Sequence, residues 1–237
     1  MPRFARIAIA NFPHHVTQRG NAKQFLLAED SERTVYLQLL QEYLGLYEVS
    51  LLGYCLMSNH VHLILLPQET NSLALALKQT HGRYAAYWNA TKRLSGHVWQ
   101  GRFYSCPLDD AHLWIALRYV ERNPVRAGLA TRPQDWPWSS AAAHLGECEA
   151  PTWLTMERFG SRWPPSTWGA YLQEPETEEQ LRELRRCTHT GRPLGAADFV
   201  SQLEGLTKRR LVPLKGGRPR HRAHNSSQTC FHLGDHQ

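Results

Sequence analysis

The chain has 237 residues, of which 42% are hydrophobic and 10% aromatic, a composition typical of a globular protein with room for one domain and an appendage. No apolar run reaches the roughly 18 residues of a membrane span, and the apolar part of the N-terminus is too short for a signal peptide. Five cysteines, an odd number without C-x-x-C spacing, indicate neither a disulfide framework nor a zinc ribbon, and they favour a reducing cytoplasm.

Charge is distributed unevenly along the chain. The net charge is +6. Residues 182–237 carry 11 Lys/Arg and 4 Asp/Glu (+7), whereas residues 1–181 carry 16 Lys/Arg and 17 Asp/Glu (−1). Residues 78–132 hold 9 basic residues against 3 acidic ones, which is again +6. Such a distribution offers phosphates a positive surface, although basic runs are also common on solvated surfaces.

The hydrophobic pattern of the first 90 residues predicts three strands and two helices. Residues 14–19 are predicted to form a strand, and a helix capped by Ser31 is expected to run to about Tyr47. Residues 50–56 and 60–66 are expected to form two strands joined by a tight turn. A helix capped by Asn71 or Ser72 is then expected to run to about residue 89.

A fourth strand and a further helix complete the predicted sheet domain. The strand is expected over residues 103–108, and the helix after it is capped by Asp109 or Asp110, contains Tyr119 and is stopped by Pro124. The order β-α-β-β-α-β with an extra helix predicts an α+β fold of the ferredoxin-like split βαβ type. We expect an antiparallel sheet with helices on one face and the other face open for a ligand.

The pattern weakens beyond residue 132. Residues 133–175, rich in proline and tryptophan, are expected to wrap around the domain, and residues 176–186 to form a charged helix. A short helix is expected near residue 200, followed by a disordered polar end. These features divide the chain into a main domain, residues 1–145, and a basic, partly helical extension, residues 146–237, whose charge is expected to be separate from the core.

Two histidines on the third predicted strand could bind a metal ion. Successive side chains of a strand point to opposite faces, so His60 and His62 project together and Val61 points the other way. Two neutral imidazoles at this spacing can chelate one divalent ion. A His-X-His pair on a strand is also commonly satisfied by protein partners, and a lone helical tyrosine such as Tyr119 is more often a packing residue. These residues alone leave both interpretations open.

Four segments resemble, in the same order, motifs of the HUH single-tyrosine transposases, and most closely the REP-associated tyrosine transposases. They are PHHVTQRGN (13–21), CLMSNHVHL (55–63), VWQGRF (98–103) and YVERNPVRAG (119–128). The second is similar to the metal signature of the family and the fourth to its tyrosine helix. The resemblance covers residues 13 to about 145. Ser58 departs from it, because the family usually has proline there.

The resemblance implies a metal-dependent single-stranded DNA endonuclease and strand transferase that acts on hairpin-bearing, REP-type DNA. Tyr119 would attack the scissile phosphorus to give a 5′-phosphotyrosine and a free 3′-hydroxyl, without ATP or another nucleotide. His60, His62 and Asn123, one helical turn beyond Tyr119, would hold Mg²⁺ or Mn²⁺. Asn123 could instead cap its helix before Pro124, and the two roles can coexist.

Several residues are candidates for contact with DNA. The resemblance places four polar residues of the first strand segment where DNA is read: His15, Gln18, Arg19 and Asn21. Six arginines are phosphate candidates, since a guanidinium fork matches phosphate oxygens: Arg19, Arg83, Arg102, Arg118, Arg122 and Arg126. Glu121 could instead neutralise Arg118 or Arg122.

Aromatic and C-terminal residues add further candidates. Trp99, in a glycine-flanked loop, is the favoured residue for stacking on an unpaired base, with Tyr104 as another. Tyr84 and Trp88, at helical spacing, are expected to be core residues. Arg218 and Arg220 lie in a Gly-Arg-Pro segment that fits a minor groove or a solvated tail equally well.

The expected partner is single-stranded or hairpin DNA, with no membrane and no nucleotide cofactor, and the protein is expected to be a monomer or a homodimer associated with the bacterial nucleoid. One alternative is a domesticated hairpin-binding protein that does not cleave. Another is an HUH replication initiator or relaxase. The histidines precede the tyrosine by 59 positions (119 − 60), an order that favours the transposase.

Overall fold

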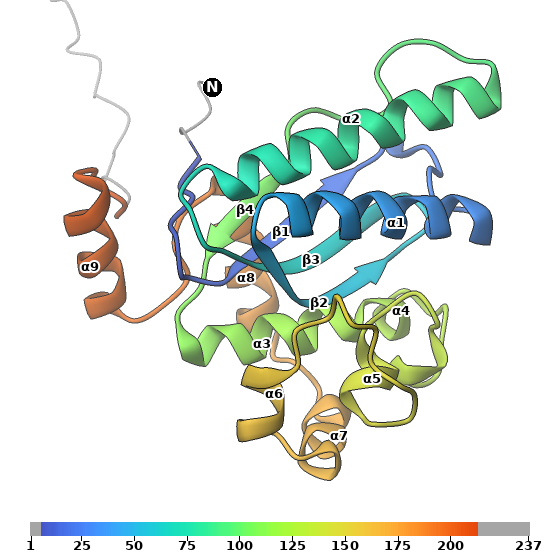
Figure 1. Ribbon diagram of the computed structural model, residues 1–237. Coiled ribbons are helices and arrows are strands. Elements are labelled where there is room, and N and C mark those ends of the chain that lie inside the picture. Colours follow the sequence, from blue (N-terminus) through green and yellow to red (C-terminus); the bar gives the residue numbers. More distant parts are fainter. Residues whose placement is uncertain (1–5, 213–237) are drawn as a thin grey trace, which may run out of the picture.

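A four-stranded antiparallel sheet lies at the centre of the computed structural model, which describes residues 6–212 (Figure 1). The strands are β1 (His14–Arg19), β2 (Val49–Leu56), β3 (His60–Pro67) and β4 (Tyr104–Pro107). Their order across the sheet is β2-β3-β1-β4, and each neighbouring pair is antiparallel. With one helix after β1 and one after β3, this is the ferredoxin-like split βαβ arrangement, so the predicted fold class is confirmed.

The helices follow in chain order. They are η1 (Asn21–Lys23), α1 (Asp30–Leu46), α2 (Ser72–Lys92), α3 (Asp110–Glu121), α4 (Asn123–Arg126), η2 (Pro133–Asp135), α5 (Ala141–His144), α6 (Glu157–Arg162), α7 (Pro165–Gln173), α8 (Glu178–Thr190) and α9 (Ala197–Thr207). Asp109 caps α3 as expected, since its side chain accepts a hydrogen bond from the backbone of His112. The cap of α1 differs from the prediction, because Glu29 and Glu32 form a capping box there in place of Ser31.

Both faces of the sheet are covered by helices. Figure 1 shows α1 and α2 across one face, where Val61, Leu63 and Leu65 of β3 are buried against them. Helices α3 and α8 contact the other face, and they share a second hydrophobic cluster with Ile64 and Cys106. The expectation that this second face stays open is therefore wrong. The apolar side of α3 must be buried like that of any amphipathic helix, and the sheet is the surface available to it.

A glycine allows α3 to approach the sheet closely. A Cβ atom added at Gly53 of β2 would lie 2.4 Å from Cδ2 of Leu117, which is too short for a contact between carbon atoms. β2 also changes register with β3 between Leu51 and Gly53, as at a bulge. A side chain at position 53 would meet the Leu117 side chain of α3, which would have to shift to make room for it.

The segment after α4 wraps along the outer edge of β2, as expected. The backbone N–H of Leu56 donates to the carbonyl of Trp138 (2.8 Å), and that of Thr155 donates to the carbonyl of Leu51 (2.8 Å). These bonds occupy backbone groups of an edge strand that would otherwise be free to pair with another chain.

Helix α8 brings the C-terminal part of the chain onto the sheet, where it contacts β4 and β1. Thr177 and Gln180 form a capping box at its start, and Gly191 ends it at φ 73°, in the left-handed conformation that glycine adopts without strain. It begins and ends slightly later than the predicted charged helix. Beyond it, α9 packs Phe199 and Leu203 against Ile7 near the start of the described chain.

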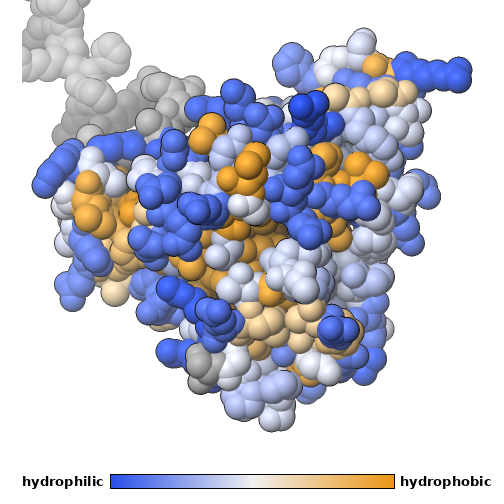
Figure 2. Space-filling model, in the orientation of Figure 1, coloured by the Kyte–Doolittle hydropathy of each residue, from blue (hydrophilic) through white to orange (hydrophobic). Residues whose placement is uncertain are grey.

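The surface is mixed in polarity. Figure 2 shows hydrophilic residues around the rim of one face and hydrophobic residues towards its middle. Across residues 6–212, no helix is long and apolar enough to cross a membrane.

The cysteines of the described residues form no disulfide. Cys55, Cys106, Cys148 and Cys187 are all free thiols.

Candidate active site

A cavity of about 620 Å³ lies between the second face of the sheet and the helices that cover it. Its walls come from β1, β3 and β4, from the end of α3 and from α4, and from α8. They include Arg19, His60, His62, Tyr119, Asn123, Arg126, Arg185 and His189. Segments that are distant in the sequence therefore meet at one place, and that place holds most of the predicted chemistry.

The two histidines of β3 project into this cavity together. Val61 between them is fully buried on the opposite face, among the residues that pack against α1 and α2, so the predicted alternation is confirmed. The rings of His60 and His62 are 5.0 Å apart, centroid to centroid. Opposite them on β1 lie Arg19 and Thr17, which pair with His60 and His62 respectively. Residues directly opposite in an antiparallel pair share a face, so these four side chains belong to one surface.

Burial keeps both rings neutral. It lowers the pKa of His60 to about 4, with the charge of Arg19 adding to the effect. It lowers the pKa of His62 well below the ordinary value, and neighbouring His60, His15, Arg126 and Arg19 act in the same direction. A neutral imidazole is the form of histidine that binds a metal, so the pair is in the right state at neutral pH.

Tyr119, at the end of α3, lies directly against the histidines. Its ring is 5.4 Å from that of His62 and 5.7 Å from that of His15, nearly perpendicular to both. The guanidinium of Arg126 lies 4.1 Å from the centre of the tyrosine ring, and Nε of Arg185 donates to the phenolic oxygen at 3.4 Å. One cation thus contacts the hydroxyl and a second lies over the ring of a residue that would have to lose its proton in order to attack a phosphate.

Asn123 is a helix cap that also lines the cavity. Its Nδ2 donates to the carbonyls of Tyr119 (3.1 Å) and Val120 (3.4 Å), so its predicted capping role is present. The amide oxygen is not used in these bonds. Within residues 6–212 no group of three or more His, Cys, Asp or Glu could hold a metal. Two imidazoles with an amide oxygen suit a divalent cation that takes its remaining ligands from phosphate and water.

Two of the predicted phosphate-binding arginines lie at the cavity. Arg19 is exposed at the end of β1. Arg126 forms an ion pair with Glu176 and donates to the carbonyl of Tyr119 at 2.5 Å, so it fixes the tyrosine's helix as well as supplying charge. His15 also lines the cavity, but both of its ring nitrogens bond to Thr188 and His62. The expectation that His15 reads DNA is therefore wrong, because neither nitrogen is left for a base.

Other predicted DNA contacts lie elsewhere. Gln18 is buried on the opposite face of β1, where it donates to the carbonyl of Gly101 (2.7 Å). Trp99 is buried too, and its Nε1 donates to the carbonyl of His81 (2.9 Å). The expectation that Trp99 stacks on bases is wrong, because its ring fills the core. Tyr84 and Trp88 belong to the same core, as expected. Three polar candidates are exposed away from the cavity, namely Asn21, Arg83 and Arg102.

The arginine pair on either side of Tyr119 is structural. Arg118 is buried beneath Tyr171 and donates to Gln180 (3.1 Å), and Nε of Arg122 donates to Glu176 (2.9 Å). Neither guanidinium lines the cavity, so these two are not placed to bind phosphate there. The alternative that Glu121 neutralises them is also wrong, because Ser140, His144 and Trp168 form hydrogen bonds with its carboxylate.

Helix α8 supplies functional residues that the sequence reasoning missed. Arg185, Thr188 and His189 all line the cavity. Tyr104 of β4, which was already a stacking candidate, also lines it, and its ring is stacked 4.8 Å from that of His189. The i, i+3, i+4 spacing of the three α8 residues was a usable signal, because such residues share one helical face. The expectation that the charge of the C-terminal extension is separate from the core is therefore wrong for α8, whose Arg185 lines the cavity.

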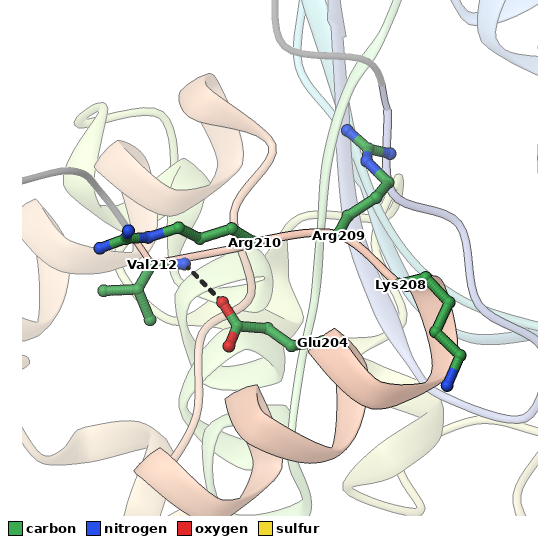
Figure 3. A pocket seen from close by; sticks show the side chains of 5 residues that line it. All are labelled: Glu204, Lys208, Arg209, Arg210 and Val212. Atoms are coloured by element: carbon green, nitrogen blue, oxygen red, sulfur yellow. Dashed lines mark hydrogen bonds between the residues drawn. The ribbon is translucent and has the colours of Figure 1, made fainter.

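A second basic region lies at the end of α9. Lys208, Arg209 and Arg210 line a cavity of about 580 Å³ together with Val212 and Glu204, and Figure 3 shows them arranged around the turn that follows the helix. Glu204 accepts hydrogen bonds from the backbone N–H groups of Leu211 (2.6 Å) and Val212 (3.1 Å), and these bonds lower the pKa of its carboxyl. Glu204 thus holds the turn. Arg218 and Arg220, the predicted groove-binding arginines, lie outside the described residues.

The fold and the site together define a split βαβ domain with a His-X-His pair and a tyrosine at one cavity. Residues 9–123 match the family model described as "Transposase IS200 like". This part of the chain is similar to the IS200-like transposase family.

Two known proteins are similar to this chain. A Haemophilus influenzae protein described as a REP-associated tyrosine transposase is 23% identical over 150 residues, which span 56% of this chain and 85% of that protein. A solved structure of a REP-associated tyrosine transposase bound to a REP hairpin superposes with a TM-score of 0.53 at 16% identity, covering 65% of this chain and 92% of that one. The latter likeness concerns the fold.

Proposed function

We propose that this protein cuts and rejoins single-stranded, hairpin-bearing DNA through a covalent bond between Tyr119 and a 5′-phosphate. One observation carries the proposal: a tyrosine and two neutral histidines from one chain line the same cavity. The family match supports the class of enzyme. The hairpin in the structure of the related transposase is the reason to expect a hairpin here.

The proposed reaction is a transesterification. The Tyr119 hydroxyl loses its proton, its oxygen forms a bond to the scissile phosphorus, and the bond from phosphorus to the 3′-oxygen breaks. The 3′-oxygen takes up a proton and leaves as a hydroxyl. Because one phosphodiester replaces another, a second 3′-hydroxyl can reverse the step, and neither ATP nor another nucleotide is consumed.

Positive charge from this chain's own residues assists the step. Arg185 donates to the phenolic oxygen and Arg126 lies over the ring, so both favour the developing phenolate. Arg19 is exposed at the opposite wall, where its guanidinium can pair with a backbone phosphate. His60, His62 and Asn123 would hold Mg²⁺ or Mn²⁺. A divalent ion in that position would supply charge stabilisation at a non-bridging phosphate oxygen.

The test is a denaturing gel that detects covalent protein–DNA adduct. The substrate is a hairpin oligonucleotide with randomised single-stranded flanks, labelled at its 3′ end in one reaction and at its 5′ end in another, with Mn²⁺ present. A 5′-phosphotyrosine retains the DNA downstream of the cut, so only the 3′ label should shift with the protein.

Two matched variants assign the nucleophile. Tyr119→Phe removes only the hydroxyl and should abolish the adduct while hairpin binding persists. Tyr87→Phe makes the same change on α2, away from the cavity, and should leave adduct formation intact. An adduct that persists in Tyr119→Phe, or one that carries the 5′ label, would contradict the proposal. Hairpin binding without any adduct in wild type would favour a binding protein that does not cleave.

A further inference from the structure

A chain of hydrogen bonds links the backbone of α8 to the proposed metal-binding His62. The Thr188 hydroxyl lies 2.8 Å from the carbonyl oxygen of Leu184, and its Oγ1 lies 2.7 Å from Nδ1 of His15. Nε2 of His15 lies 2.9 Å from Nδ1 of His62, and the two rings are parallel to within 2°. His15, His62 and Thr188 are all buried, so these polar groups depend on one another for partners.

Each proton in this chain has a single consistent position. A carbonyl only accepts, so the one hydroxyl proton of Thr188 points to Leu184. Oγ1 of Thr188 must then accept the hydrogen bond from His15, which places a proton on Nδ1 of His15. Neither imidazole bonds to a carboxylate and both are buried, so each ring is neutral and carries one proton. Nε2 of His15 is consequently an acceptor, and His62 donates to it from Nδ1.

This arrangement determines which nitrogen His62 can offer to a metal. With its proton on Nδ1, the ring keeps its lone pair on Nε2, and no group among residues 6–212 forms a hydrogen bond with that nitrogen. His60 has the same tautomer by a separate route, because its Nδ1 lies 2.6 Å from Oδ1 of Asn59. The amide of Asn59 is oriented in turn by donation from Nδ2 to the carbonyl of Lys23 (3.4 Å). Both histidines therefore present Nε2.

We propose that Thr188 and His15 are positioning residues that hold His62 in its Nδ1–H tautomer and so keep Nε2 available to a divalent cation. The inference rests on the proposed function of the site. Partners of this kind fix the orientation of a metal-binding histidine and raise its basicity. It also gives a role to α8, which lies beyond the matched segment 9–123, and it explains why His15 is not itself a ligand.

The tautomer can be read directly in metal-free protein. Long-range ¹H–¹⁵N correlation spectra of ¹⁵N-histidine-labelled wild type distinguish Nδ1–H from Nε2–H rings. The expected result is Nδ1–H for His15, His60 and His62. A wild-type spectrum with His62 as Nε2–H, or as a mixture of tautomers, overturns the inference whether or not any variant folds.

Two substitutions then test whether the Thr188 hydroxyl fixes the tautomer of His62. Thr188→Val keeps the branched shape and removes the hydroxyl, so His15 loses its acceptor and His62 should lose its fixed tautomer. Thr188→Ser keeps the hydroxyl and should retain the wild-type spectrum. His60 serves as an internal control, because Asn59 holds it independently of α8. A Thr188→Val protein whose His62 remains wholly Nδ1–H overturns the inference.

Calorimetric titration with Mn²⁺ connects the tautomer to the metal. Thr188→Val should bind Mn²⁺ about 10- to 100-fold more weakly than wild type, and Thr188→Ser should bind within a few-fold of it. Equal affinity in wild type and Thr188→Val overturns the inference while leaving the proposed metal site in place. If wild type has the expected tautomers but binds no Mn²⁺, the positioning of His62 stands and the metal requirement in the proposed function fails.

Discussion

The rings of His62 and Tyr119 lie 5.4 Å apart, at 82° to one another, within a single chain. His62 comes from the centre of the sheet and Tyr119 from the helix that covers it, and both are buried. The proposed metal ligand and the proposed nucleophile are therefore assembled by the fold of one protomer. A dimer would not need to exchange helices to complete the site.

Mixing two inactive variants tests this arrangement. Tyr119→Phe lacks the nucleophile and His62→Ala lacks a ligand, so neither should form the DNA adduct alone. If each chain uses its own residues, a mixture of the two should also stay inactive at any protein concentration. Adduct recovered in the mixture, on the adduct gel, would show that the tyrosine of one chain acts with the histidines of another.

Substitutions at two neighbouring positions of β3 should affect different properties: His62 should matter for cleavage and Val61 for stability. His62→Ala, or chelation of wild type with EDTA, should abolish adduct formation. Val61→Ala should lower the free energy of unfolding by about 1–2 kcal/mol, because it leaves a cavity among fully buried side chains, and should leave cleavage intact. Urea unfolding and the adduct gel measure the two effects separately. Full cleavage in EDTA would exclude a metal-assisted reaction.

Arg185 should contribute to the rate more than to stability. Its side chain is exposed, and its Nε reaches the Tyr119 hydroxyl at 3.4 Å. Arg185→Gln should slow adduct formation by about 10- to 100-fold, because the phenolate loses a charged donor. Arg182→Gln removes the same charge from an exposed position on the same helix and serves as the control. Equal slowing in single-turnover assays of both variants would indicate a general electrostatic effect on DNA binding.

Glu121 should matter for stability, although it lies on the same helix as Tyr119. Its carboxylate is fully buried and accepts hydrogen bonds from Ser140 (2.6 Å), His144 (2.5 Å) and Trp168 (2.9 Å). Glu121→Ala leaves these buried donors without their acceptor and should cost about 3–5 kcal/mol of unfolding free energy. Glu149→Ala, at an exposed position, should change it by less than about 0.5 kcal/mol. Urea unfolding gives both values.

Buried His81 should make the fold sensitive to acid. Burial lowers its pKa to about 3, with the charge of Arg6 acting in the same direction. The unfolded chain binds this proton near pH 6.5 and the folded chain does not, so the stabilisation is complete above pH 6.5 and declines as pH falls towards 3. At pH 5 the loss is about 2 kcal/mol for this residue.

A variant isolates the contribution of His81 to that loss. His81→Gln should show a difference in unfolding free energy between pH 7.5 and pH 5 that is about 2 kcal/mol smaller than in wild type. Comparing the two pH values within each protein removes any constant cost of the substitution. The same difference in both proteins would show that His81 does not cause the acid sensitivity.

Much of the fold followed from local patterns in the sequence. Strand alternation gave the common direction of His60 and His62, and Asp109 marked the start of the tyrosine helix, because these features depend on neighbours in the chain. The β-α-β-β-α-β order fixed the type of sheet. Hydrophobic periodicity also identified Tyr84 and Trp88 as core residues.

The surroundings of the site were decided by the tertiary structure. A pattern shows which side of an element is buried, but it does not show which distant element covers it. Thr188 bonds to His15 across 173 positions and Arg185 reaches Tyr119 across 66, so no local pattern could connect them. For the same reason Trp99, a plausible stacking residue by sequence, became part of the core, and Arg118 and Arg122 found acidic partners on a later segment. The sequence by itself thus determined the proposed chemical groups, and long-range packing decided which of them meet at the cavity.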